Sequence, residues 1–174
     1  MKIKDVTLIG VFTALLLGGQ LVLSGISGIE IVTVLFASFV YARGIKSGLM
    51  LATCFSLIRC FIFGFMPTVI ILYIVYYNIF AIVVGVLSFV FKRKISVKNI
   101  VILVSTVLIL TLLFTMLDNV ITPLFYGYSR ETAKAYFIAS LYTVIPQSIC
   151  AVVTMSCLFY PLIELYERLK LIKE

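Results

Sequence analysis

Histidine is absent from this chain of 174 residues, and charged residues make up only 12% of it. Histidine is the side chain most often used as a general base and the commonest metal ligand in proteins. The sequence also contains no Gly-x-Ser-x-Gly motif and no acidic motif of the metal-binding type. These absences argue against a membrane-bound hydrolase or transferase, so we expect neither an enzymatic activity nor a bound metal or cofactor.

Cysteine is scarce, and its four occurrences all fall inside apolar stretches: Cys54, Cys60, Cys150 and Cys157. This placement argues against a disulfide framework, and no paired loop cysteines mark a zinc site. The compartment of the protein therefore has to be inferred from hydropathy and from the distribution of charge.

Apolar residues dominate the chain, which is 63% hydrophobic and has a mean hydropathy of +1.24. Such values exceed the roughly half-apolar composition of soluble domains and predict an all-α integral membrane protein. At about 20 apolar residues per span, a single domain over 1–174 has room for about six transmembrane helices and for no soluble domain. We expect these helices at 5–24, 29–42, 44–64, 67–91, 98–120 and 135–166. The segment 29–42 is short, which predicts either a small tilt or a partial helix that begins inside the protein.

Positive charge is distributed unevenly between the expected loops. Most of the 14 Lys and Arg residues belong to the two termini and to the loops near 43–46 and 92–98. On the other side of the membrane, the expected loops contain only Arg130 and Lys134. Because cytoplasmic loops are enriched in Lys and Arg, we expect both termini to be cytoplasmic. The same rule accounts for the net charge of +7, so no nucleic-acid partner is expected.

Arg59 is the exception to this distribution, because it lies within the apolar segment 44–64. A guanidinium at a bilayer centre costs about 3 kcal/mol even on insertion-based scales, and such charges mark buried pairs, ligands or water-filled cavities. With the termini inside, Arg59 lies in the outer third of its span. Since the inner halves of the spans are almost entirely apolar, we expect an outward-facing binding cup. The candidate ligand-binding residues are Glu30, Arg59, Tyr77, Asn78, Asp118 and Gln147.

Each of these residues also has a structural interpretation. Glu30 lies at an expected helix N-terminus, where the helix dipole would stabilise a carboxylate that faces water. Arg59 could form an internal ion pair with Asp118, and Asn78 and Gln147 could hydrogen-bond to neighbouring helices. One aromatic helix face favours core packing, yet it would also suit stacking on a flat heterocycle: Tyr73, Tyr76, Tyr77 and Phe80.

A second surface is indicated on the first segment, where Gly10, Ala14 and Gly18 recur at intervals of four residues. Small residues at this spacing form a groove that lets another helix backbone approach closely. The partner is either another span of this chain or a separate membrane subunit. Because the sequence has neither a P-loop nor an obvious inverted repeat, active transport by this protein would need other subunits.

Over nearly its whole length, the chain resembles the substrate-binding S components of energy-coupling factor (ECF) vitamin transporters. The resemblance rests on the length, the six expected spans, the cytoplasmic termini and the segment Ala14-Leu15-Leu16-Leu17-Gly18, where the family has Ala-x-x-x-Ala. The segment Gly28–Thr33 is similar to the acidic start of helix two in a subset of the family. The corresponding part of the last span, Pro146–Ala151, lacks the histidine of that subset.

The resemblance implies a receptor for a water-soluble vitamin or vitamin precursor, embedded in the lipid bilayer of a prokaryotic cell membrane. Its implied partners are a transmembrane coupling protein, which the first helix would meet, and two ATPase subunits. Arg59 would then bind a carboxylate or phosphate of the ligand, or hold Glu30 and Asp118 in place. From the residues alone, a self-sufficient small carrier and a non-transport scaffold subunit remain as alternatives.

Overall fold

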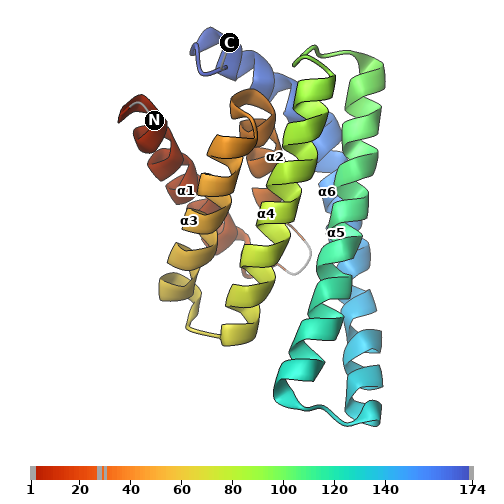
Figure 1. The fold of residues 1–174 in the computed structure, drawn as a ribbon. Coiled ribbons are helices and arrows are strands. Elements are labelled where there is room, and N and C mark those ends of the chain that lie inside the picture. The colour runs from red at the N-terminus through yellow and green to blue at the C-terminus, as the bar shows by residue number, and fades with distance from the viewer. Residues whose placement is uncertain (1–2, 27–28, 30, 173–174) are drawn as a thin grey trace.

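The computed structural model describes residues 3–26, 29 and 31–172, which form six α-helices and no β-strand (Figure 1). The all-α prediction is therefore confirmed for this part of the chain. Five of the helices described are long and apolar enough to cross a membrane, as expected of a multi-pass membrane protein. In chain order, the helices are α1 (Ile3–Leu23), α2 (Val32–Arg43), α3 (Ile45–Phe63), α4 (Pro67–Val90), α5 (Val97–Tyr126) and α6 (Arg130–Arg168).

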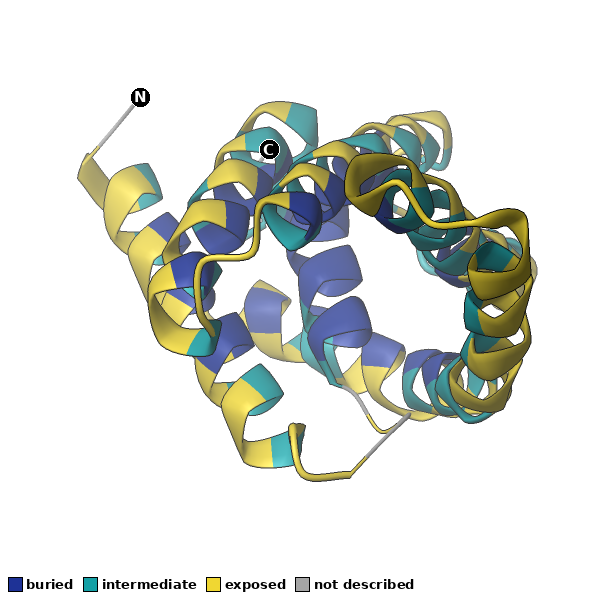
Figure 2. Ribbon diagram, turned by 90° about the horizontal axis from the view of Figure 1, so that it is seen from below, coloured by how far each residue is buried: buried dark blue, intermediate teal, exposed yellow. Residues whose placement is uncertain are grey.

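Helix α2 is shorter than the span predicted at 29–42, because it begins only at Val32 and has 12 residues. At 1.5 Å per residue it is about 18 Å long, whereas the hydrocarbon core of a bilayer is about 30 Å thick. The helix is thus the partial helix that the sequence allowed. Ten of its residues are buried, and it packs against α1, α3, α4 and α6. Figure 2 shows these buried turns in the middle of the ring of longer helices.

The α5–α6 connection is much tighter than predicted. The sequence predicts one helix that ends at 120 and another that begins at 135, but α5 continues through Pro123 to Tyr126 and α6 begins at Arg130. A proline in the last turn of a helix removes only one backbone hydrogen bond, and the remaining turns hold. Gly127, with a φ of 61°, then ends α5 in the left-handed conformation. The Ser129 side chain caps α6 by accepting a hydrogen bond from the backbone N–H of Thr132.

Helix α1 begins and helix α6 ends at the same end of the bundle, which we call the terminal end (Figure 1). Arg43 ties three segments together there. Its Nη2 donates to the carboxylate of Asp5, and its Nη1 donates to the carbonyl oxygen of Leu171 at 2.8 Å. The rings of Phe12 and Tyr166 also meet, with centroids 5.6 Å apart, so α1 and α6 are joined at this end.

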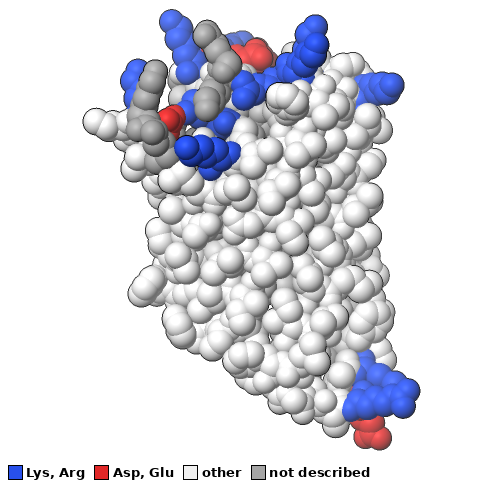
Figure 3. Space-filling view, in the orientation of Figure 1, with Lys and Arg blue, Asp and Glu red and all other residues white. Residues whose placement is uncertain are grey.

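Charged side chains gather at the two ends of the molecule, and a wide uncharged band separates them on the face shown in Figure 3. Arg130, Glu131 and Lys134 belong to the end opposite the terminal end, at the tip of the α5–α6 hairpin. This arrangement matches a bilayer, whose apolar core disfavours charge and whose surfaces accept it.

Candidate ligand-binding site

A cavity of about 560 Å³ lies at the end of the bundle opposite the terminal end. This volume is within the range of small-molecule binding sites, which is roughly 300–1,000 Å³. Its walls come from five helices and from the segment between α1 and α2. The lining residues are Gln20, Leu23, Ser24, Ile26, Ile29, Val32, Arg59, Phe63, Tyr73, Tyr77, Thr143 and Gln147.

Arg59 is held in one wall of this cavity by two aromatic rings and one hydrogen bond. Its Cζ lies 4.8 Å from the ring centroid of Phe63 and 4.1 Å from that of Tyr73. Its Nε donates to Oε1 of Gln20 at 3.2 Å, and Nε2 of Gln20 donates to the Tyr73 hydroxyl at 2.9 Å. Attraction between a cation and the faces of aromatic rings offsets part of the cost of burying the guanidinium.

Arg59 has no carboxylate partner among the described residues, whose two ion pairs are Arg43–Asp5 and Arg168–Glu164. Asp118 lies elsewhere, in the α5–α6 hairpin. It accepts hydrogen bonds from the hydroxyls of Thr122 at 2.7 Å and Tyr136 at 2.6 Å. The interpretation of Arg59 and Asp118 as an internal ion pair is therefore wrong. The reason is that α3 and α5 each pack against α4, and the Asp118 carboxylate bonds to groups of α5 and α6. Figure 1 shows that α5 and α6 extend beyond the other helices.

The outer nitrogens of Arg59, Nη1 and Nη2, donate no hydrogen bond to any described residue. A guanidinium presents these nitrogens in a planar fork that matches a carboxylate or a phosphate. Because the two rings and Gln20 already fix the side chain, an anion in the cavity would meet a donor that needs little reorganisation.

Helix α2 supplies a second source of positive potential. Its first residue, Val32, lines the cavity, and its N-cap residue, Ile31, makes no side-chain capping hydrogen bond. The first N–H groups of a helix lack intrahelical partners, and the helix dipole places a partial positive charge at this end. A short helix that starts inside the bundle thus directs its positive end toward the same space as Arg59.

Aromatic residues close the cavity toward the terminal end. Tyr77 lines it and is only 5% exposed, with the rings of Phe36, Phe55 and Tyr76 at centroid distances of 5.0–5.1 Å. A separate small pocket of about 30 Å³ lies beside the cavity, between Tyr76, Phe114 and Gln147. The faces and edges of these rings would pack against a flat ligand, while hydroxyl and amide groups could bond its polar atoms.

The structure brings three of the six predicted ligand-binding residues together in this cavity: Arg59, Tyr77 and Gln147. Asn78 does not line it, and its Nδ2 donates to the carbonyl oxygen of Ile74 in the same helix. Asp118 is held in the α5–α6 hairpin, as described above. Glu30 lies outside the described residues.

Three further residues contact Arg59 and were not among those six: Gln20, Phe63 and Tyr73, the last of which was expected only on an aromatic helix face. Gln20 interrupts an otherwise apolar run of α1, and Phe63 follows Arg59 by four residues, which places both on one face of α3. The polarity of Gln20 and the spacing of Phe63 are signals that the sequence contains. Their joint contact with Arg59 depends on how α1 packs against α3.

The small-residue groove on α1 is not packed against another described helix. Gly10, Ala14 and Gly18 are all exposed. A Cβ atom built on Gly10 or Gly18 would meet nothing within 4 Å. The interpretation of this groove as a packing surface within the chain is therefore wrong for the described residues, and the face is open to lipid or to another subunit.

No group of three or more His, Cys, Asp or Glu side chains that could hold a metal ion occurs in the described part of the chain. The chain was also compared with known proteins. No family model, no curated protein and no solved structure matches it.

Proposed function

We propose that this chain is the substrate-binding subunit of an ECF-type importer in a prokaryotic cell membrane. In this proposal both termini are cytoplasmic, and the cavity around Arg59 opens to the outside. The single observation that supports it best is the cavity of about 560 Å³ with a stacked guanidinium that has no carboxylate partner among the described residues. A charge placed in an apolar segment favours a functional role.

The substrate would be a small, flat, anionic molecule such as a vitamin or a vitamin precursor. Arg59 and the N-terminus of α2 would bind its carboxylate or phosphate. Tyr77 would pack against its ring, and Gln147 would bond a polar group near the mid-depth of the bundle. The aromatic layer below Tyr77 would block passage toward the cytoplasm, so release would need movement of the whole subunit or of its helices.

The partners would be a transmembrane coupling protein and two ATPase subunits. The exposed groove of Gly10, Ala14 and Gly18 supports this part of the proposal, because a partner helix could approach the α1 backbone without a steric barrier. The ATPases would supply the free energy of transport, since the chain itself has no P-loop.

Native mass spectrometry of the gently purified protein, followed by titration with the co-purified small molecule, tests the proposal. We expect one bound molecule with an anionic group and an aromatic ring. Arg59→Ala should weaken binding by about 100-fold or more, because it removes both the charge and the stacked fork. Arg130→Ala, at the tip of the hairpin and outside the cavity, should leave the affinity unchanged.

Two results would overturn the proposal. Equal affinity of wild type and Arg59→Ala for the co-purified molecule would show that this molecule does not bind at Arg59. Uptake by vesicles that contain this protein alone, without ATPase subunits, would instead identify a self-sufficient carrier.

A further inference from the structure

A second cavity, of about 570 Å³, lies at the terminal end between the α2–α3 turn and the end of α4. It is separate from the cavity around Arg59, and no lining residue is shared. Four cationic side chains contribute to its wall. The lining residues are Arg43, Gly44, Ile45, Lys46, Gly85, Ser88, Phe89, Lys92 and Arg93.

Three of these four cations are not neutralised by the described part of the chain. Arg43 is paired with Asp5 and belongs to the contact that joins α1 to α6. Lys46, Lys92 and Arg93 form no ion pair with any described carboxylate. The cavity therefore concentrates positive charge, and low-dielectric walls strengthen its field on an incoming anion.

The first turn of α3 forms part of the same wall. Its N-cap residue, Gly44, makes no side-chain capping hydrogen bond, and the N–H groups of Ile45 and Lys46 belong to the first turn, whose donors have no intrahelical partner. Close packing holds this helix end against α4. A Cβ on Gly85 would come within 2.4 Å of the Ile45 Cγ1 and 3.2 Å of its backbone N. Free helix N–H groups beside cationic side chains are a common arrangement for binding phosphate.

The turn that follows α4 contributes two cations to this wall. Lys92 and Arg93 have φ values of 50° and 54°, a left-handed conformation that favours glycine. The backbone N–H of Arg93 donates to the carbonyl oxygen of Ser88 at 3.0 Å, which fixes the turn. The Arg93 Nη2 reaches to 3.7 Å from where a Cβ on Gly44 would stand.

We propose that this cavity binds the phosphate of an anionic phospholipid headgroup. A lipid source is favoured over a soluble phosphate because apolar surface adjoins the cations on the membrane side. Phe89, in the cavity wall, is 84% exposed and Val90 is 62% exposed. These exposed apolar side chains would contact acyl chains next to the bound headgroup. Basic pockets between helices at a membrane surface bind such headgroups.

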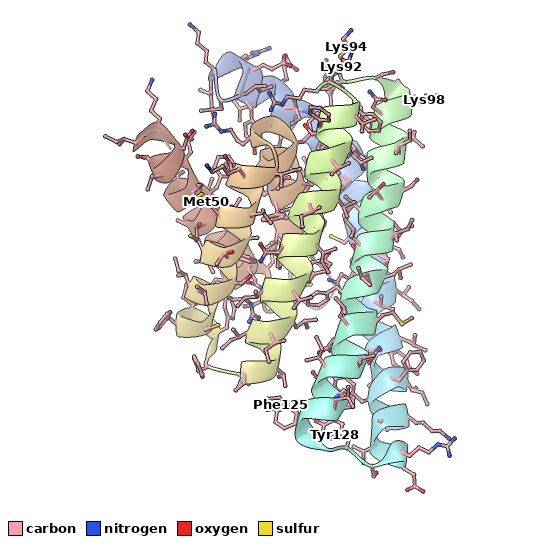
Figure 4. All side chains as sticks on the ribbon, viewed as in Figure 1. Met50, Lys92, Lys94, Lys98, Phe125 and Tyr128 are labelled. Carbon is pink, nitrogen blue, oxygen red and sulfur yellow. The ribbon has the colours of Figure 1, made fainter. Side chains whose placement is uncertain are left out.

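The test uses the full-length protein purified in detergent and compares bound phosphatidylglycerol with bound phosphatidylcholine by native mass spectrometry. The cavity variant combines Lys46→Gln, Lys92→Gln and Arg93→Gln, and it leaves the structural Arg43 in place. The control variant combines Lys94→Gln, Lys98→Gln and Lys170→Gln, which remove the same charge from exposed positions outside the cavity. Figure 4 shows that Lys92, Lys94 and Lys98 all lie at the terminal end, near the α4–α5 turn.

We expect wild type to prefer phosphatidylglycerol, the cavity variant to lose at least fivefold of that preference, and the control variant to keep it within twofold. Equal losses in the two variants would overturn the proposal, because the preference would then follow overall charge. Thermal unfolding by circular dichroism checks that both variants fold. If the cavity variant does not fold, the single changes Lys92→Gln and Arg93→Gln are measured in the same way.

A second arm of the experiment separates the two sources of phosphate. Inorganic phosphate is added to lipid-free protein at constant ionic strength, and the unfolding temperature is measured. We expect phosphatidylglycerol to raise that temperature and inorganic phosphate to leave it unchanged. Stabilisation by inorganic phosphate alone would overturn the lipid assignment and assign the cavity to a soluble anion.

Discussion

The two cavities are nearly equal in volume, about 560 and 570 Å³, and both are cationic, yet they are built in different ways. The cavity around Arg59 has one guanidinium, which is clamped between two rings and oriented by Gln20. The cavity at the terminal end has four cations on long side chains, of which Arg43 alone forms an ion pair with a described carboxylate.

This difference shows two ways in which positive charge can be arranged to bind an anion. A fixed planar donor in an aromatic wall loses little conformational entropy on binding and accepts a narrow range of geometries, so it favours selectivity. The terminal cavity combines several cations on long side chains with adjoining apolar side chains, so it would hold a lipid phosphate through summed charge and acyl contact more than through one fixed geometry.

Replacing arginine by lysine should give the largest difference between the two cavities in its effect on binding. Arg59→Lys keeps the charge but loses the planar fork and the hydrogen bond from Nε to Gln20. We expect it to weaken binding of the co-purified small molecule by about 30-fold, roughly 2 kcal/mol, in a calorimetric titration. Arg93→Lys should lower the preference for phosphatidylglycerol by less than twofold. If Arg59→Lys bound its ligand as tightly as wild type, both cavities would act as simple point charges.

A pair of glycine substitutions tests the packing that forms the terminal cavity. Gly85→Ala places a Cβ against the side chain and backbone of Ile45, so we expect a loss of about 1–2 kcal/mol of stability. Gly10→Ala meets nothing within 4 Å, and alanine favours helix, so stability should stay equal or rise by up to about 1 kcal/mol. Thermal unfolding in one detergent measures both. Equal effects would show that α3 does not press on α4 at Gly85.

The hydroxyl of Tyr73 allows a finer test of the clamp around Arg59. Tyr73→Phe keeps the ring beside the guanidinium but removes the acceptor for Gln20 Nε2. We expect the affinity for the co-purified molecule to fall about fivefold, close to 1 kcal/mol, because Gln20 would orient Arg59 less well. Tyr142→Phe, at a position that is 80% exposed, is the matched control. An unchanged affinity in Tyr73→Phe would show that the rings alone orient Arg59.

Much of the helical framework could be predicted from hydropathy, because a long apolar run has few alternatives to a helix in a bilayer. The ends of α1, α3 and α4 fall within two residues of the predicted limits. The short length of the α5–α6 connection could not be predicted, because the proline, charged and polar residues between 120 and 135 are typical of a loop. The hairpin instead tolerates one missing hydrogen bond at Pro123 and caps α6 with Ser129.

For the candidate site, the sequence predicted how deep each residue lies in the bundle but not which way its side chain points. Arg59, Tyr77 and Gln147 were expected in the same cup, and all three line one cavity. Asn78 was expected there too, but its side chain lies outside the cavity wall and donates a hydrogen bond to a backbone carbonyl of its own helix. Position along a span follows from sequence and orientation, whereas the direction in which a side chain points depends on how each helix is rotated against its neighbours.

Composition and charge by themselves determine that the chain is an apolar helical protein with an expensive cation inside one of its helices, because those properties depend on local runs of residues. Only the tertiary structure decides which groups surround that cation. Gln20 is 39 residues away from Arg59 in sequence, and Tyr73 belongs to another helix. Their contacts with Arg59 arise where α1, α3 and α4 pack together, which no local pattern specifies. That packing also places the guanidinium at the edge of a cavity, where it forms no ion pair with any carboxylate of the described residues.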